Sequence, residues 1–506
     1  MSQSYSIKYL RAFLLMVCLS CGLGASQSRQ PNILLITADD LGYEVLNDTL
    51  DLTPNLDAFA RDGMQFVNAH MNTPICQPSR SVVATGRYGH NSGMMGFMHM
   101  KKRVPLVMQT LRDAGYLTGI LGKVRHSTPD DTYEWDFMYD YPDLGAGRDP
   151  EKYYGYCQEF FARSAAEGKP FYFMVNSHDP HRPFHNPEKP MRKAAAPSRL
   201  FSPSEVTVPT YLADLPGVRL ELSYYYNSVR RLDDTFGKVI QALRESGLDQ
   251  NTLVLFVTDN GSAVPFAKAN AYLAGTRTPC FWQWPGVIKP GTVDREHFVS
   301  SIDFFPTFAD AAGLTPPAGV NGRSLVPLLQ GGFEDDREFV FTQIDYKIGG
   351  PATPMRCVQN KCFGYIFNPW SMDGVRYSNN NEGMIMKSMQ AAAKTDPEVA
   401  ARVEMYRHRV LEEFYDLEKD PGCVNNLIDH PEYQSQIKAF QERLEQWMEA
   451  TNDPVLSAFE KRGSDAGIKA ALAHDYPKKK SLFSDLQIQK NKAKQQARNQ
   501  KKSKEK

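Results

Sequence analysis

The chain has 506 residues, of which 42% are hydrophobic and 23% are charged, so it is long enough to form two globular domains. Its 58 basic and 58 acidic side chains give a formal net charge of zero. This balance excludes a global field that attracts nucleic acid or an anionic membrane.

The first 25 residues have the pattern of a signal peptide. Lys8 and Arg11 precede an apolar stretch at 12–19, which is too short to span a bilayer, and small residues at 22–25 offer cleavage sites. A lipoprotein cleavage site before Cys21 is the alternative interpretation. We therefore expect a secreted or periplasmic protein, lysosomal in a eukaryote, without a stable membrane span.

Three continuous apolar runs of strand length follow, at 32–37, 170–176 and 252–258. Each ends in polar residues of the kind that bind ligands. Runs that are apolar on both faces are typical of a largely parallel α/β sheet, in which ligands bind beyond the carboxyl ends of the strands. Helical patterns lie between them, at 54–62, 106–114 and 220–246.

The pattern changes after residue 335. Short strands are predicted at 339–342, 355–367 and 414–417, and an amphipathic helix at 431–449. We therefore expect a larger α/β domain at 26–335 and a smaller α+β domain with an antiparallel sheet at 336–460. Residues 461–506, rich in Lys and Gln toward the end, are expected to be a basic, disordered tail.

The smaller domain contains two cysteines that bracket four residues, Cys357 and Cys362. A two-residue turn at Gln359 and Asn360 would place them opposite each other on a hairpin, within reach of a disulfide. A zinc site is the alternative, but no second Cys or His pair is nearby in the sequence. We therefore predict a disulfide, which the oxidising compartment favours.

The most informative segment is Cys76-Gln-Pro-Ser-Arg80. Pro78 fits the first turn of a helix, so Cys76 is expected at a helix N-terminus with Arg80 one turn further on the same face. Free backbone N–H groups and the helix dipole make such a position suitable for a tetrahedral oxyanion. The alternative interpretation of Cys76 alone is a small buried apolar side chain.

Four oxygen ligands follow two of the predicted strands. Asp39 and Asp40 come after the first run, and Asp259 and Asn260 after the run at 252–258. Each pair alone is a common turn sequence. Together they form a hard ligand set that suits Ca²⁺, with Mg²⁺ as the second choice.

In their order along the chain, these segments resemble the active site of the type I sulfatases, and the resemblance runs from about residue 32 to residue 447. Within that family the chain looks most like the heparan N-sulfatases, in the segments 89–93, 177–182 and 354–359. The resemblance implies an alkaline-phosphatase-like fold and a sulfated glycan as substrate. It also implies that a formylglycine-generating enzyme oxidises Cys76 to an aldehyde whose hydrate attacks sulfur and contacts the metal.

The resemblance also implies roles for the remaining polar residues. The catalytic residues would be Cys76, Arg80, Lys123, His126, His181 and Lys268, and the substrate-binding residues His178, Arg182 and Arg356. The chain departs from the family pattern at two positions: one extra residue precedes His126, and Lys268 stands where the compared relatives have Arg.

Three alternatives remain open. The protein could be an O-sulfatase on another sulfated polysaccharide, or a phosphatase or phosphodiesterase of the same fold group. Those phosphate enzymes use Ser or Thr and two zinc ions, so Cys76 argues against them. A glycan-binding protein without catalysis is the third alternative. The sequence indicates no oligomeric state.

Overall fold

The computed structural model describes residues 30–47, 50–348, 351–484, 488–489 and 491–492. The predicted signal peptide at 1–25 and the last residues of the predicted tail lie outside these ranges. No helix in the described part of the chain is both long enough and apolar enough to cross a membrane.

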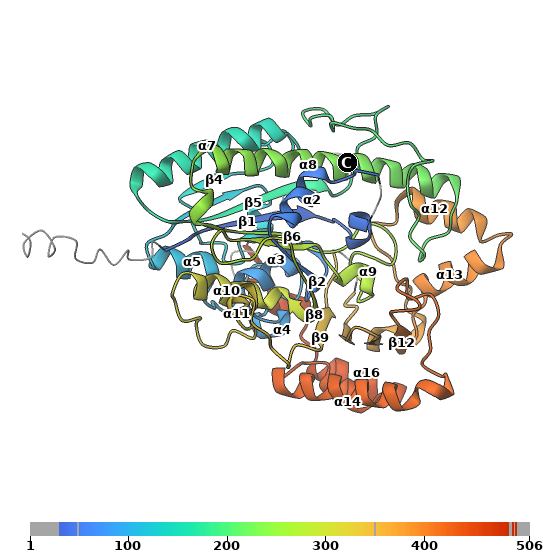
Figure 1. Ribbon diagram of the computed structural model, residues 1–506. Helices are drawn as coiled ribbons and strands as arrows, with labels where there is room; N and C mark the ends of the chain where they lie inside the picture. Colours follow the sequence, from blue (N-terminus) through green and yellow to red (C-terminus); the bar gives the residue numbers. More distant parts are fainter. Residues whose placement is uncertain (1–29, 48–49, 349–350, 485–487, 490, 493–506) are drawn as a thin grey trace, which may run out of the picture.

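An eight-stranded sheet forms the centre of the molecule (Figure 1). In order across the sheet, its strands are β4 (Phe137–Tyr139), β3 (Leu117–Leu121), β5 (Phe171–Pro180), β1 (Asn32–Asp39), β6 (Thr252–Thr258), β7 (Cys280–Gln283), β2 (Met64–His70) and β8 (Thr292–Ser300). The three predicted apolar runs are β1, β5 and β6, and β1 pairs in parallel with both of the others. Only β7 runs antiparallel to its neighbours in the described sheet. The mostly parallel α/β fold is therefore confirmed.

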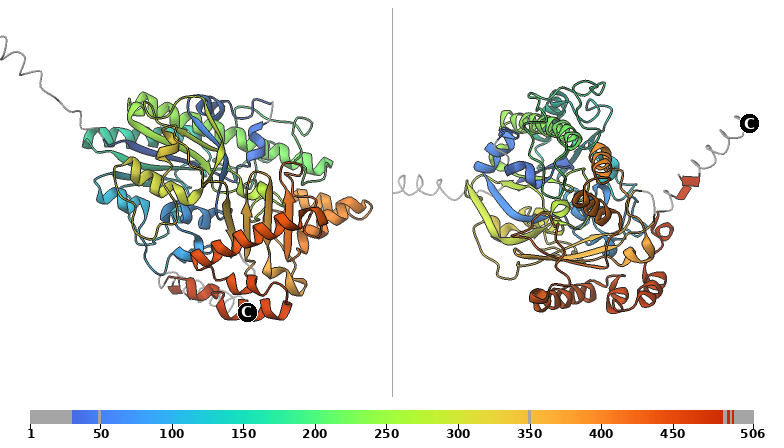
Figure 2. Two further views of the ribbon diagram at one scale, coloured as in Figure 1. Left: turned by 60° about the horizontal axis from the view of Figure 1, so that its bottom comes forward. Right: turned by 90° about the vertical axis from the view of Figure 1, so that its right-hand side faces the viewer.

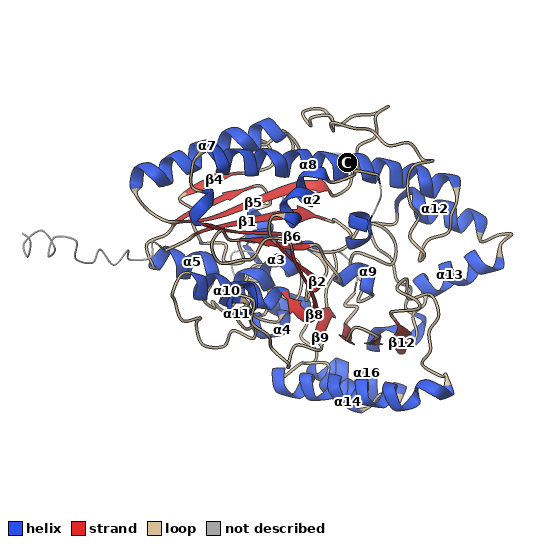
Figure 3. Ribbon diagram, viewed as in Figure 1, coloured by secondary structure: helices blue, strands red, loops and turns tan. Residues whose placement is uncertain are grey.

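Helices cover both faces of this sheet (Figure 1, Figure 3) because alternate residues of its strands point to opposite sides. In β1, Leu34 and Ile36 join one apolar cluster, and Ile33 and Leu35 join the other. Each buried side chain of this size contributes about 1.5–3 kcal/mol. The first cluster includes α2 (Pro54–Arg61), α7 (Pro150–Glu167), α8 (Pro216–Glu245), α12 (Gly383–Ala392) and α13 (Pro397–Arg407). The second includes α3 (Cys76–Thr85), α5 (Val107–Asp113), α10 (Phe304–Ala311) and α11 (Val326–Leu329).

A separate four-stranded antiparallel sheet lies beside the large one, in the order β12 (Glu412–Asp416), β11 (Phe363–Phe367), β10 (Met355–Gln359), β9 (Val340–Ile344). Its two faces also alternate. Met355 and Cys357 pack into the first cluster of the large sheet, whereas Val358 packs against α14 (Gln434–Thr451). The second sheet is therefore fixed to the core of the large sheet on one face and covered by helices on the other (Figure 2).

Short helical segments complete the described structure. They are η1 (Tyr43–Asn47), α4 (Gly89–Ser92), α6 (Val124–Ser127), η2 (Asp249–Asn251), α9 (Leu273–Thr276), η3 (Ser301–Asp303), η4 (Pro369–Gly374), η5 (Pro431–Tyr433), α15 (Leu456–Glu460), α16 (Asp465–Asp475) and η6 (Lys479–Leu482).

Helix α16 corrects one expectation. Residues 461–484, predicted as the start of a disordered tail, include this helix, whose Ile468 and Ala471 are buried in the cluster beneath the second sheet. The Tyr476 hydroxyl donates to Asp345 Oδ1 at 2.9 Å. The sequence did not reveal this helix, because the segment is rich in Lys and has few buried apolar residues.

The predicted disulfide is also wrong. Cys357 lies opposite Ile366 in the pairing of β10 with β11, and Cys362 lies in the loop between these strands. All six cysteines of the described residues are free. Three residues, 360–362, connect the strands in place of the two-residue turn expected at Gln359 and Asn360. Asn360 Oδ1 holds this turn by accepting hydrogen bonds from the backbone N–H groups of Cys362 and Phe363.

Candidate active site

Two pairs of oxygen-bearing side chains meet at the carboxyl ends of β1 and β6. Because these strands are parallel neighbours, with Ala38 opposite Thr258, the residues that follow them lie side by side. The Asp40 backbone N–H donates to Asp259 Oδ1 at 3.1 Å, and the Asn260 amide donates to Asp40 Oδ1 at 2.8 Å. The structure thus brings together the predicted metal ligands Asp39, Asp40, Asp259 and Asn260, all of them buried.

Cys76 is the first residue of α3, as the sequence predicts, and its Sγ lies 3.5 Å from Asp39 Oδ1. Ile75 before it is extended, so the N-terminus of the helix opens at the site. Burial raises the pKa of the Cys76 thiol despite the nearby charge of Lys268. The unmodified thiol is therefore protonated at neutral pH and is a poor nucleophile.

Arg80 lies one turn further along α3 and is held on two sides. Its Nε and Nη2 contact Asp259 Oδ2 at 3.0 and 2.9 Å. Its Nη1 donates to Thr37 Oγ1 at 2.8 Å and to Asn176 Oδ1 at 2.7 Å. Burial lowers the pKa of Arg80, but the charges of Asp259 and Asp39 outweigh burial and raise it. The guanidinium is therefore a fixed positive charge.

Two lysines point into the cluster that Asp39, Asp40, Asp259 and Asn260 form. The ammonium of Lys123, from the turn after β3, contacts Asp39, and that of Lys268 contacts Asp40. Burial raises the pKa of Asp39, but the positive charges around it, Lys123 first, hold it well below its usual range. Burial and the charge of Asp39 raise the pKa of Asp259 to about 7.

The donor set fits a hard divalent cation. Oxygen atoms of Asp39, Asp40 and Asp259 lie within 4.8 Å of one another. Asp40 Oδ2 and Asn260 Oδ1 are buried and accept no hydrogen bond from the residues that the structure describes. Buried acceptors without a partner are costly, so a cation at their meeting point would stabilise them.

His181 is the histidine that reaches this cluster. Its Nε2 lies 3.9 Å from Asp40 Oδ2, and a third of its side chain is exposed. Burial lowers its pKa below the usual value. His126 is also partly exposed, with its ring edge-on to Phe97, and burial lowers its pKa to about 3. His126 is therefore neutral at ordinary pH.

His178 contacts the protein framework. Its ring packs against Gly147, where a Cβ atom would lie 2.1 Å from Nδ1, and against Tyr141. The next residue, Asp179, accepts hydrogen bonds from Arg148 at 3.0 Å and from Arg231 at 2.7 and 2.9 Å. This buried group fixes the loop that carries His181. No signal in the sequence links Asp179 to its two arginines.

The two predicted substrate arginines differ in position. Arg182 follows His181 and pairs with Glu221, and its Nη2 is buried without a hydrogen-bond partner among the described residues. Arg356 is fully buried and pairs with Asp345 at 2.9 Å and Asp453 at 2.5 Å. The predicted contact of Arg356 with substrate is therefore wrong, because both of its carboxylate partners belong to the protein.

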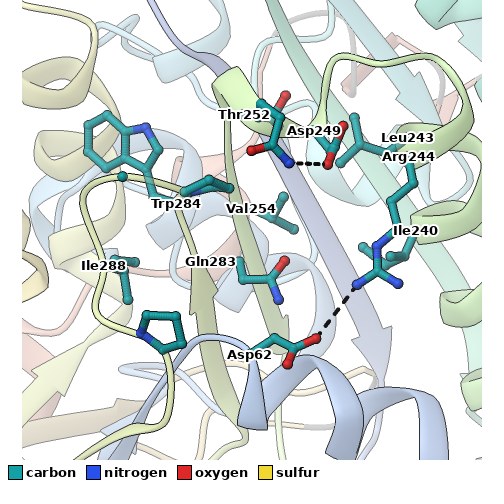
Figure 4. A pocket seen from close by; sticks show the side chains of 14 residues that line it. Asp62, Ile240, Leu243, Arg244, Asp249, Thr252, Val254, Gln283, Trp284 and Ile288 are labelled. Carbon is teal, nitrogen blue, oxygen red and sulfur yellow. Dashed lines mark hydrogen bonds and ion pairs between the residues drawn. The ribbon is translucent and has the colours of Figure 1, made fainter.

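The pocket in Figure 4 lies away from this cluster. It has a volume of about 370 Å³ and adjoins Thr252 and Val254 at the opposite end of β6 from Asp259. Across it, Asp62 and Arg244 approach to 3.9 Å. None of the predicted site residues lines it.

Comparison with known proteins agrees with the geometry. The sequence profile of the Sulfatase family matches residues 31–314, and a profile described as "N-sulphoglucosamine sulphohydrolase, C-terminal" matches residues 261–368. The chain therefore belongs to the sulfatase family, which makes it a hydrolase of sulfuric esters.

Three relatives show how far the similarity extends. The N-sulphoglucosamine sulphohydrolase of Homo sapiens is 30% identical over 475 residues, covering 86% of this chain and 93% of that protein. An ulvan-active sulfatase of Formosa agariphila is 28% identical, covering 84% of this chain and 81% of that protein. A protein solved in complex with its substrate D-glucosamine-2-N,6-O-disulfate shares the fold, with a TM-score of 0.62, 18% identity, and coverage of 84% of this chain and 99% of that one.

Proposed function

We propose that the protein is an exported, metal-dependent sulfatase that removes sulfate from a sulfated glycan, with N-sulfated glucosamine as the preferred substrate. The observation that carries this proposal is the position of Cys76. It starts a helix within 3.5 Å of a metal-type carboxylate, Asp39, and Arg80, Lys123 and Lys268 surround the same cluster.

Arg80, Lys123 and Lys268 are suited to stabilise the negative charge that develops during sulfate transfer. In sulfate transfer, negative charge develops on the leaving atom and on the nonbridging oxygens. Arg80, Lys123 and Lys268 are held in place before substrate arrives, since each contacts a carboxylate of the cluster. Charged groups fixed in this way are each worth about 3–4 kcal/mol in comparable sites.

We propose that a separate formylglycine-generating enzyme converts Cys76 to formylglycine. One hydroxyl of the hydrated aldehyde would attack sulfur while the bond from sulfur to the sugar oxygen or nitrogen breaks. Loss of a proton from the second hydroxyl would re-form the aldehyde and break the C–O bond to sulfate, and water would then rehydrate the aldehyde. Asp259, whose charge acts on residue 76, would accept a proton from one of these hydroxyls. The protonated thiol described above offers no comparable nucleophile.

Asp39, Asp40, Asp259 and Asn260 would hold Ca²⁺, with Mg²⁺ as the second choice. The bound cation would add positive charge and acidify a hydroxyl beside it. His181, which reaches the cluster and is partly exposed, would protonate the departing oxygen or nitrogen. His126, neutral and half-buried, would hydrogen-bond the substrate, and the half-buried Arg182 would contact the sugar.

The nucleophile is tested by mass analysis of the peptide that contains Cys76. In active protein this peptide should carry the aldehyde, and Cys76→Ala should abolish turnover while the thermal midpoint changes little. Cys157→Ala is the matched control, since Cys157 is equally buried in α7 and far from the cluster in sequence. Full activity with an unmodified Cys76 thiol would refute the proposal.

The metal is tested by chelation. Removal of divalent ions should abolish activity and lower the thermal midpoint, because the cation binds only the folded chain. Ca²⁺ should restore both better than Mg²⁺ or Zn²⁺. Two zinc ions and no calcium in elemental analysis would favour a phosphatase-like enzyme.

The substrate is tested by comparing sulfate release from N-sulfated, 6-O-sulfated and 2-O-sulfated glucosamine or uronic acid derivatives. The 30% identity to the human N-sulphoglucosamine sulphohydrolase supports the N-sulfated sugar. The similarity to the ulvan-active sulfatase supports the alternative of an O-sulfatase. Release from O-sulfated sugars alone would reject N-sulfate specificity and leave the sulfatase assignment intact.

A further inference from the structure

Lys347 is a buried cation that the catalytic cluster does not include. It follows β9, and only 7% of its surface is exposed. Its ammonium donates to the carbonyl of Ser378 at 2.7 Å and lies 3.9 Å from the centre of the Tyr377 ring. These two contacts leave N–H groups that can bind a further acceptor.

No carboxylate neutralises this ammonium. Among the described residues, no Asp or Glu oxygen lies within 4.0 Å of it, in contrast to Lys123 and Lys268. Glu382, the nearby acid, is engaged by Arg407 at 2.6 Å. Burial, together with the charge of Arg409, lowers the pKa of Lys347 to about 8. A buried charge without a counter-ion is unfavourable, so burying the charged Lys347 ammonium costs the folded protein free energy.

Two loops link the surroundings of Lys347 to the segments that carry Cys76 and Lys268. On one side, the Tyr346 backbone N–H donates to Met95 O at 3.0 Å, and Met98 of the same loop accepts from Gln77, the neighbour of Cys76, at 2.7 Å. On the other side, Asn379, which follows Ser378, donates to the carbonyl of Lys268 at 3.2 Å. Lys347 is therefore connected to the cluster through two loops, one that binds Gln77 beside Cys76 and one that binds the carbonyl of Lys268.

We propose that Lys347 forms a subsite for a second acidic group of the substrate, a sulfate or carboxylate on the sugar that is cleaved or on its neighbour. The proposal deepens the proposed function and rests on it for the sulfated glycan. An anion at Lys347 would supply the missing counter-ion. A charge-assisted hydrogen bond in a buried site is worth about 1.5–3 kcal/mol, or about 10- to 100-fold in affinity.

The experiment compares two probes, glucosamine N-sulfate and glucosamine N,6-O-disulfate. Wild-type protein should bind the disulfate about 10- to 100-fold more tightly. Lys347→Met should raise KM for the disulfate by that factor, with kcat nearly unchanged, and leave KM for the monosulfate as it was. Lys347→Arg should restore most of the preference. A disaccharide of N-sulfoglucosamine and a uronic acid tests whether the neighbouring sugar supplies the anion.

Lys361→Met is the matched control, because Lys361 lies in the exposed β10–β11 loop, where it pairs with Glu296. Binding is also measured by calorimetry on Cys76→Ala protein, so that affinity is separated from turnover. If the affinity difference persists while neither sugar is hydrolysed, the N-sulfate assignment fails and the subsite stands. Equal affinities for mono- and diacidic probes, or an unchanged preference in Lys347→Met, would overturn the subsite.

Discussion

At the scale of single residues, the cluster is held by side chains that stand behind it. Asn176 is fully buried within β5 and uses all of its hydrogen-bonding capacity. Its Oδ1 accepts from Thr37 and Arg80, and its Nδ2 donates to the carbonyls of Leu121 and Gly122 at 3.1 and 3.0 Å. One amide thereby fixes both the guanidinium of Arg80 and the turn that projects Lys123.

We predict that Asn176→Ala lowers kcat by about 10- to 100-fold, because small misplacements of catalytic groups have effects of this size. KM should change less, since the cations remain present. Asn227→Ala is the control: Asn227 is equally buried and hydrogen-bonded, in α8, away from the cluster. The two proteins are compared by steady-state kinetics and thermal unfolding. Equal kcat values in the two variants would show that Asn176 has only a structural role.

The sequence located most of the residues that meet in the cluster. The positions of Asp39 and Asp259 were predictable because they come at the ends of apolar runs. The position of Cys76 was predictable because Pro78 fits the first turn of a helix. Asn176 and Asp179 were not, because an asparagine or aspartate at the end of a predicted apolar run is ordinary turn chemistry. Their roles depend on partners more than 30 positions away, such as Arg80 and Arg148.

At the scale of elements, strand content was predictable and register was not. The apolar runs at 32–37 and 252–258 became β1 and β6, because burial on both faces leaves a continuous pattern. Helix α8 starts four residues before the predicted Leu220, since Pro216 and Gly217 fit the first turn of a helix but carry no apolar signal. The β10–β11 loop differs because an asparagine side chain organises it.

That loop leads to a prediction about cysteine reactivity. Cys362 is partly exposed and Cys357 is buried, so an alkylating reagent should label Cys362 in native, unreduced protein and Cys357 only after unfolding. Burial raises the pKa of Cys362, which should make labelling faster at alkaline pH. Peptide mapping measures both sites, and Cys362→Ser should remove the native label. A peptide pair linked through residues 357 and 362 would contradict this arrangement.

At the scale of the whole molecule, a buried charged group joins three parts of the chain. Arg356 of β10 lies between Asp345, which follows β9, and Asp453, which follows α14. Tyr476, beyond α16, donates to the same Asp345. His90 of α4 in the catalytic part lies 3.8 Å from Asp453. Arg356, which the sequence suggested as a substrate contact, therefore connects the second sheet, its covering helices and the large sheet.

We therefore predict that Arg356→Met lowers the free energy of unfolding by about 3–5 kcal/mol, because it leaves two buried carboxylates without their partner. The carboxylates cannot reach water, since both side chains have no exposed surface. Arg323→Met, which removes a half-exposed pair with Asp336, should cost at most about 1 kcal/mol. Denaturant unfolding measures both, and KM of the folded fraction should stay unchanged. A large rise in KM with normal stability would instead return Arg356 to the substrate pocket.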